Sequence, residues 1–151
     1  MQPHTYTVSA ARSLFEQVVE SADPTTAARA MVSLGNVLAE QGRSLEAASV
    51  FERVVELGDA PLAASALSNL GDVLVAQGDR SSAHRAYELA VQSGTPATAA
   101  GALMGLGNLM VADGRFNEAI DAFQRAEEAG HPDAAVRLGW LRGKTAGRRF
   151  A

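Results

Sequence analysis

The chain has 151 residues, no cysteine and a formal net charge of −4; 47% of its residues are apolar and only 5% are aromatic. The lack of cysteine excludes disulfides, thiol catalysis and thiolate metal sites, and no stretch approaches the roughly 18 apolar residues of a membrane span. An apolar fraction supplied mainly by Ala, Leu and Val favours closely packed helices over sheets. We therefore expect a single all-α domain over residues 1–151, located in the cytoplasm.

Charge divides the chain into an acidic body and a basic end. Every aspartate and glutamate lies at or before Asp133. The segment 137–151 has no acidic residue, and its basic residues are Arg137, Arg142, Lys144, Arg148 and Arg149. The favoured interpretation is that this basic end is a solvated tail. The next is that it docks onto the acidic body of another copy. Nucleic-acid binding ranks third, because an acidic body repels a phosphate backbone.

The chain repeats itself at a constant step of 36 residues, as the Leu-Gly pairs at 34–35, 70–71 and 106–107 show. Three further sets of positions keep this step: Gly42/Gly78/Gly114, Phe51/Tyr87/Phe123 and Gly58/Gly94/Gly130. A step of this size is typical of one supersecondary unit stacked on copies of itself.

In chain order, the first predicted element is a single helix over residues 9–21, whose apolar residues match those of a helix one period later. Three helix hairpins are predicted next, over residues 24–58, 60–94 and 96–130. In the middle hairpin, apolar residues fall three and four positions apart, which is the spacing of a helix with one buried face. A terminal helix over 132–142 and a basic tail over 143–151 complete the chain.

Turn and cap residues support these boundaries. Asp23 and Thr95 each precede a proline, and both are predicted N-caps. The glycines at 42, 78 and 114 are predicted to turn the chain within each hairpin. Those at 58, 94 and 130 are predicted to end the second helix in a left-handed conformation.

A third set of glycines lies inside the first helices, at 35, 71 and 107. A glycine inside a helix costs about 1 kcal/mol relative to Ala, so we expect a neighbouring backbone to lie too close for a side chain. The expected neighbour is the second helix, at Ala47, Ala83 and Ala119.

This pattern resembles the tetratricopeptide repeat family. Bulky residues at Met31, Leu67 and Leu103, the Leu-Gly pairs, the turn glycines and the aromatic position all occur at that family's spacing. The unit here is longer than the usual one, and the segment 126–135 with Leu138-Gly139 is similar to the related Sel1-like repeat. The resemblance implies a right-handed α-α solenoid that works as a scaffold for protein or peptide partners.

The resemblance also implies that the first helix of each hairpin lines a concave groove for the partner segment. The candidate binding residues on this face are Arg29, Val32, Asn36, Asn69, Asp72, Met104, Asn108 and Trp140. The three asparagines rank highest, because an amide both donates to and accepts from a peptide backbone. The alternative is that these amides face solvent or bond neighbouring helices. Trp140 is either a binding hot spot or a cap on the last unit, and we favour the cap.

One subtype of the family is not expected. Its members hold a peptide's terminal carboxylates with two asparagines and three basic residues. Asn36 and Asn69 match the asparagines, but Val32, Gly101 and Gly105 stand at the basic positions. Without cations an anion has no charge-assisted partner.

No catalytic residue, cofactor or metal site is predicted. His4, His84 and His131 lie far apart and none has a second ligand at metal-binding spacing. Three functions remain, in this order: a scaffold that binds a protein or peptide in its groove, a self-associating adaptor that stacks through its end units, and an enzyme or nucleic-acid binder.

Overall fold

A computed structural model describes residues 13, 16–17, 20 and 23–148 of the protein. The described residues form an all-α array with the elements α2 (Pro24–Glu40), α3 (Ser44–Glu56), α4 (Ala60–Ala76), α5 (Arg80–Ser93), α6 (Pro96–Ala112), α7 (Phe116–Glu128) and α8 (Ala134–Arg148). The predicted helix over residues 9–21 lies outside the described residues, apart from a few isolated positions. None of the described helices is long and apolar enough to cross a membrane.

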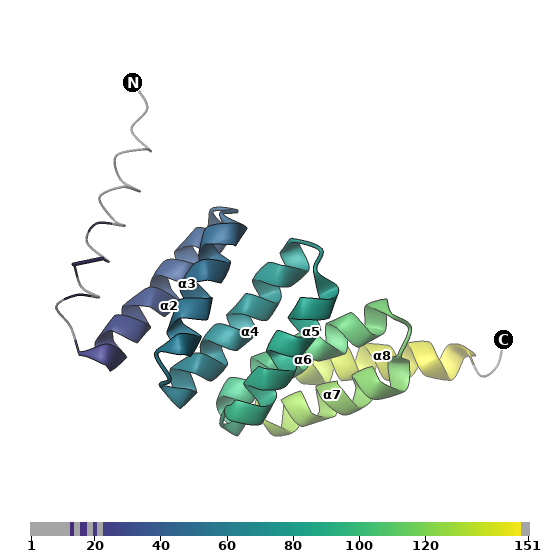
Figure 1. Ribbon diagram of the computed structural model, residues 1–151. Coiled ribbons are helices and arrows are strands. Elements are labelled where there is room, and N and C mark those ends of the chain that lie inside the picture. Colours follow the sequence, from purple (N-terminus) through teal and green to yellow (C-terminus); the bar gives the residue numbers. More distant parts are fainter. Residues whose placement is uncertain (1–12, 14–15, 18–19, 21–22, 149–151) are drawn as a thin grey trace.

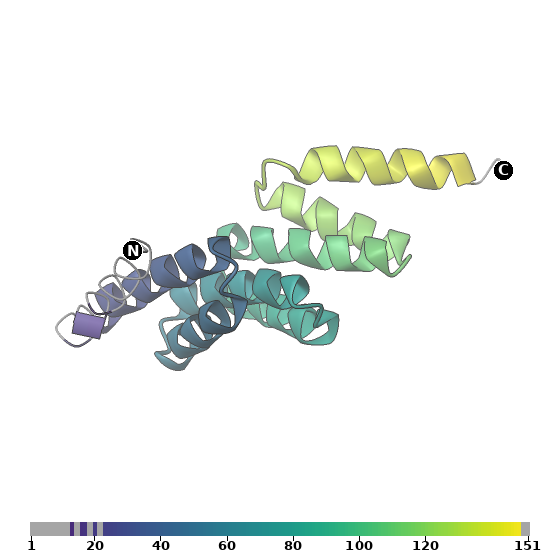
Figure 2. The ribbon, with the colours of Figure 1, turned by 90° about the horizontal axis from the view of Figure 1, so that it is seen from above.

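The helices form three antiparallel hairpins, α2–α3, α4–α5 and α6–α7, with α8 added to the last (Figure 1). Each helix packs on the next one in the chain, and the first helices of neighbouring hairpins also touch, α2 with α4 and α4 with α6. Figure 2 shows that these layers turn along the array, with α8 at its far end. The predicted all-α solenoid of helix hairpins is confirmed.

The predicted N-caps are confirmed by hydrogen bonds at the starts of α2 and α6. The Asp23 carboxylate accepts from the backbone N–H groups of Thr25 and Thr26, both at 3.1 Å, and the Thr95 hydroxyl accepts from the N–H of Thr98. These bonds satisfy donors that a helix leaves unpaired in its first turn. Local sequence therefore sets where these helices begin.

Gly94 does not end α5 in the predicted left-handed conformation. Its backbone is extended, with φ −91° and ψ 167°. Only Gly94 and Thr95 connect α5 to α6, so the chain must extend at once to reach the N-cap. A side chain is excluded here by space instead: a Cβ on Gly94 would lie 2.5 Å from Oγ1 of Thr98 and 2.7 Å from the carbonyl oxygen of Ala90.

The glycines inside α2, α4 and α6 make the expected close contacts, but not with the expected partner. A Cβ added to each would lie 2.4–2.5 Å from an aromatic ring of the same hairpin, in the pairs Gly35–Phe51, Gly71–Tyr87 and Gly107–Phe123. The prediction that the neighbours are Ala47, Ala83 and Ala119 is wrong. A helical side chain leans toward its own N-terminus, so the ring one turn later covers the alanine and meets the glycine.

Helix α8 differs from the predicted terminal helix at both ends. Residues 132–133 form a turn before it, and the helix continues through Arg148, into the segment predicted as a tail. The buried residues Ala134, Leu138 and Leu141 form one stripe against α7. Thr145 extends this stripe by another turn, and its hydroxyl donates to the carbonyl oxygen of Leu141 at 3.1 Å. Tertiary packing of this stripe outweighs the low helix propensity of the glycines at 143 and 147.

Candidate functional site

Two adjoining cavities lie along the first helices of the hairpins, and together they define what we call the groove. The smaller cavity, of about 360 Å³, lies between α2 and α4. The larger cavity, of about 940 Å³, extends from α4 and α5 across α6 to the segment His131–Arg137. Asn69 and Asp72 line both cavities, so the groove is continuous from α2 to the start of α8.

The structure brings together some of the predicted binding residues. Those that line the groove are Asn36, Asn69, Asp72, Met104 and Asn108. Arg29, Val32 and Trp140 line neither cavity: Arg29 is exposed on α2, and Val32 packs against the core.

Met104 is placed differently from the sequence prediction. It borders the larger cavity, but its side chain is buried in the core beside Ala134 and Leu138. Helix α6 packs against α4, α5 and α7. A side chain on α6 that points away from one of these neighbours can therefore still be buried against another. Met104 therefore forms the floor of the groove and does not project into it.

The asparagines of α2 and α4 bond to each other. Nδ2 of Asn69 donates to Oδ1 of Asn36 at 2.9 Å. This bond joins α2 to α4 beside the smaller cavity. It agrees with the alternative given by the sequence, in which the asparagine amides bond neighbouring helices. Each amide keeps one further group with hydrogen-bonding capacity that can face a ligand. Asn108, on α6, is exposed in the larger cavity.

A buried tyrosine holds the carboxylate of Asp72 by a hydrogen bond. Tyr87 is 2% exposed, and its hydroxyl donates to Oδ1 of Asp72 at 2.6 Å. Asp72 is exposed on its groove side, but its carboxylate is partly withdrawn from water. This desolvation raises the pKa of Asp72, and the hydrogen bond from Tyr87 acts in the opposite direction. Burial also raises the pKa of Tyr87, which keeps it a donor.

Sequence reasoning missed this role of Tyr87, although the signal was present. Position 87 is Tyr where the other hairpins have Phe, and position 72 is Asp where they have Asn. Gly105, which stands at one of the basic positions of the carboxylate-binding subtype, lies against the same ring. A Cβ on Gly71 would approach the Tyr87 ring to 2.4 Å, and one on Gly105 to 2.3 Å.

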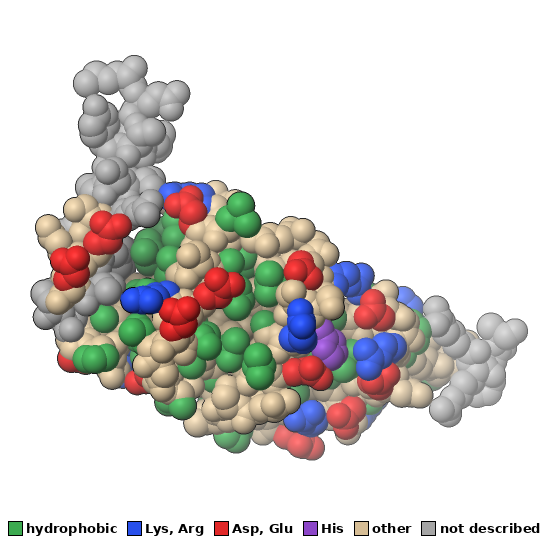
Figure 3. All heavy atoms as spheres, in the orientation of Figure 1, with side chains coloured by type: hydrophobic (Ala, Val, Ile, Leu, Met, Phe, Trp, Pro, Cys, Tyr) green, Lys and Arg blue, Asp and Glu red, His purple; other side chains and the backbone are tan. Residues whose placement is uncertain are grey.

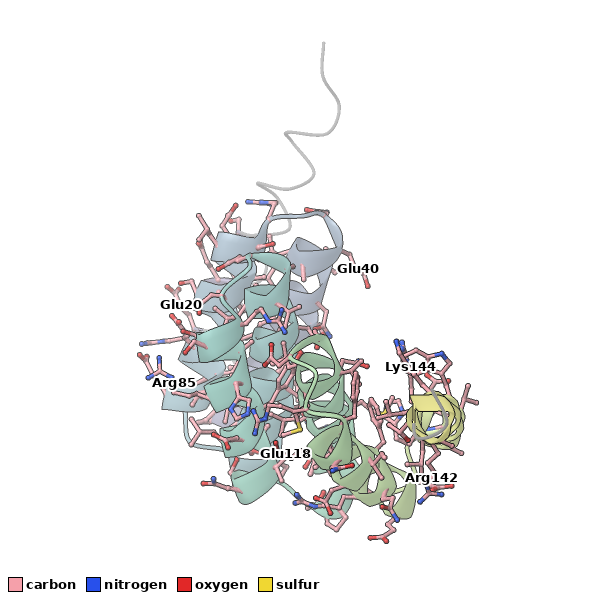
Figure 4. The ribbon with its side chains drawn as sticks, turned by 90° about the vertical axis from the view of Figure 1, so that its right-hand side faces the viewer. Glu20, Glu40, Arg85, Glu118, Arg142 and Lys144 are labelled. Atoms are coloured by element: carbon pink, nitrogen blue, oxygen red, sulfur yellow. The ribbon has the colours of Figure 1, made fainter. Side chains whose placement is uncertain are left out.

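The α8 end of the groove carries apolar and basic side chains. Val136 is 73% exposed and lines the larger cavity, and Trp140 follows one turn later at 51% exposure. Nζ of Lys144 lies 4.9 Å from the centroid of the Trp140 ring, within cation–π range. Figure 4 shows Lys144 and Arg142 leaving α8 on opposite sides.

Charge is distributed unevenly along the groove. Among the described residues that line the smaller cavity, the charged ones are Glu40 and Asp72, and none is basic. The larger cavity adds Arg80, Asp133 and Arg137. In Figure 4, Glu40 points to the side of the molecule on which α8 lies, away from Arg85. The groove is therefore acidic between α2 and α4 and of mixed charge toward α8.

The face over α3 and α5 has a different character. Figure 3 shows basic and acidic side chains interspersed across it. Several of them form pairs three residues apart, among them Arg43 with Glu46 and Arg53 with Glu56. Within the part of the chain that the structure describes, no group of three or more His, Cys, Asp or Glu side chains is arranged to hold a metal ion.

Fold and groove together define an all-α helical-repeat protein. Two models of the tetratricopeptide repeat family match the sequence, one over residues 26–93 and the other over residues 68–135. The matches together span more than half of the chain, which therefore belongs to the tetratricopeptide repeat family. The Sel1-like character of its C-terminal end stays a prediction.

No curated protein matches the sequence, but solved structures share its fold. The Sgt2 TPR domain from Aspergillus fumigatus is 21% identical, with a TM-score of 0.70 and 82% of each chain covered. BtubC (BKLC) from P. vanneervenii is 19% identical, with a TM-score of 0.74; the match covers 90% of this chain and 65% of that one. At these identities the likeness concerns the fold alone.

Proposed function

We propose that the protein is a protein–protein interaction scaffold that holds a segment of its partner in the groove. The observation that carries this proposal is the continuity of the groove, whose two cavities share Asn69 and Asp72. Stacked helical repeats build extended surfaces of this kind for protein partners, and the membership of the tetratricopeptide repeat family supports the same function.

The lining of the groove suits a peptide backbone. Asn36, Asn69 and Asn108 provide amide groups along its length, and amides pair with both the N–H and C=O groups of a peptide. Gly101 lines the larger cavity without a side chain, so a segment can lie close to α6 there, whereas the space beside Gly105 is taken by the Tyr87 ring. Val136 adds apolar surface at the α8 end.

The experiment compares capture of proteins from the native host's lysate by three forms of the chain. These are the wild type, the triple variant Asn36→Ala/Asn69→Ala/Asn108→Ala and the control Asn117→Ala. Asn117 is exposed on α7 and lies outside the groove. We expect a partner that the wild type and the control recover and the triple variant loses, with thermal melting showing that all three are folded. Equal recovery by all three forms would exclude groove binding.

Self-association through α8 is the second candidate. It is favoured by the exposure of Val136 and Trp140 on the terminal helix and by the basic residues that continue to position 149. Light scattering after size-exclusion chromatography tests it directly. Oligomers of the wild type that disappear in Trp140→Ala would support this function, and a wild-type monomer at high concentration would exclude it.

A further inference from the structure

Resting on the proposed function, we infer that the partner segment carries a basic side chain, Lys or Arg, where it crosses the smaller cavity. The receiving groups are the carboxylates of Asp72 and Glu40. The inference is about the chemistry of the partner and goes beyond groove binding as such.

The first step of the argument concerns the unpaired carboxylates. Oδ1 of Asp72 accepts from the Tyr87 hydroxyl, which leaves Oδ2 for a ligand. No described basic side chain lies within ion-pairing distance of Asp72 or Glu40, whereas Arg43, Arg53, Arg80 and Arg115 all have acidic partners. A partly desolvated carboxylate without a cation is stabilised by a cation that a ligand brings.

The second step concerns the helix ends around the cavity. Ala39 and Glu40 at the end of α2, and Ala76 at the end of α4, line the smaller cavity. The C-terminus of a helix carries a partial negative charge of about half an electron. Neither α2 nor α4 has a basic residue in its last turn, whereas α3 and α7 have Arg53 and Arg125 there. The C-terminus of α4 therefore adds to the negative potential of the two carboxylates, whereas that of α2 is offset by the N-terminus of α3, whose first residue, Ser44, also lines the cavity.

The third step concerns the shape of the site and the other charges near it. The methyl groups of Ala39 and Ala76 offer apolar contact for the aliphatic stem of a Lys or Arg side chain, whose charged end then reaches the carboxylates. Arg80 does not compete for Asp72, because it is held by Asp113 at 2.6 Å and by the carbonyl oxygen of Leu109 at 3.3 Å. Arg137 lines only the larger cavity.

The repeat itself makes this position distinct. Among the three hairpins, only the middle one combines Asp with Tyr, at 72 and 87, where the others combine Asn with Phe. The carboxylate and the hydroxyl that orients it thus occur together. A site that needed only a neutral hydrogen-bonding group would be served by the Asn–Phe combination of the flanking hairpins.

The test is a selection of a displayed random-peptide library on the immobilised chain, followed by affinity measurements on a selected synthetic peptide. We expect the selected peptides to contain Lys or Arg. Asp72→Asn should weaken binding of such a peptide by about tenfold. Replacing its basic residue by the uncharged norleucine or citrulline should cause a similar loss on the wild type and little further loss on Asp72→Asn.

Matched variants control this test. Asp121→Asn makes the same chemical change at an exposed site on α7 outside the groove, and should bind like the wild type. Glu40→Gln removes a charge from the cavity at an exposed site and provides a second test if Asp72→Asn folds poorly.

The outcomes separate the two proposals. Selected peptides without a basic residue, or an equal effect of Asp72→Asn on charged and uncharged peptides, would overturn this inference and leave groove binding intact. A selection that enriches no peptide would overturn both.

Discussion

The hydroxyl of Tyr87 donates a hydrogen bond of 2.6 Å to Oδ1 of Asp72, which joins a core residue of α5 to the floor of the groove on α4. The ring of Tyr87 performs the packing role that Phe51 and Phe123 perform in the other hairpins. The hydroxyl adds a polar contact that the other two hairpins lack. Tyr87 thereby links the stability of the middle hairpin to the orientation of one carboxylate in the groove.

Tyr87→Phe should therefore lower the free energy of unfolding by about 1.5–3 kcal/mol, which is typical of a hydrogen bond to a charged group. The ring keeps its packing, so the loss should stay below that of a cavity-forming substitution. Urea unfolding of Tyr87→Phe, Asp72→Asn and the double variant measures the effect and the coupling between the two residues. Strictly additive effects of the two substitutions would contradict a direct bond.

The raised pKa of Asp72 predicts a pH dependence with a definite sign. A carboxyl group with a folded-state pKa above its ordinary value of 3.8 binds its proton more tightly in the folded protein. Its contribution to stability is greatest below pH 3.8 and declines as the pH rises through the folded-state pKa. Relative to Asp72→Asn, the wild type should lose stability between acidic and neutral pH.

Thermal melting of both proteins across this pH range checks the prediction. A difference in melting temperature that does not vary with pH would contradict it. If the wild type is the less stable protein at neutral pH, the charge of Asp72 is retained at a cost to the fold, as is common for residues that serve binding.

Replacing glycine by alanine should destabilise the protein beside Tyr87 and stabilise it on α8. Gly71→Ala and Gly105→Ala each place a methyl group within 2.4 Å of the Tyr87 ring, and overpacking of this kind should destabilise the protein by about 1–3 kcal/mol. Gly139→Ala, in open space on α8, should instead stabilise it by up to about 1 kcal/mol through helix propensity. Chemical denaturation of the three variants distinguishes these signs, and a stabilised Gly71→Ala would show that the ring can move aside.

Local sequence determined much of the architecture. The 36-residue step predicted three helix hairpins, and three hairpins are formed by the described helices α2 to α7. The caps Asp23 and Thr95 were also predicted correctly. These features follow from interactions between residues close in the chain, such as capping hydrogen bonds and the spacing of apolar residues, and such interactions are visible without a structure.

The tertiary structure decided which side chains meet. Met104 could not be assigned from periodicity, because α6 is apolar over most of its circumference and packs on several neighbours. The extension of α8 depends on packing against α7. The bond between Tyr87 and Asp72 joins residues of different helices, whose meeting is set by how the helices pack. Sequence by itself therefore determined the repeat and its helices, while the packing of helices against one another decided the floor and the charge of the groove.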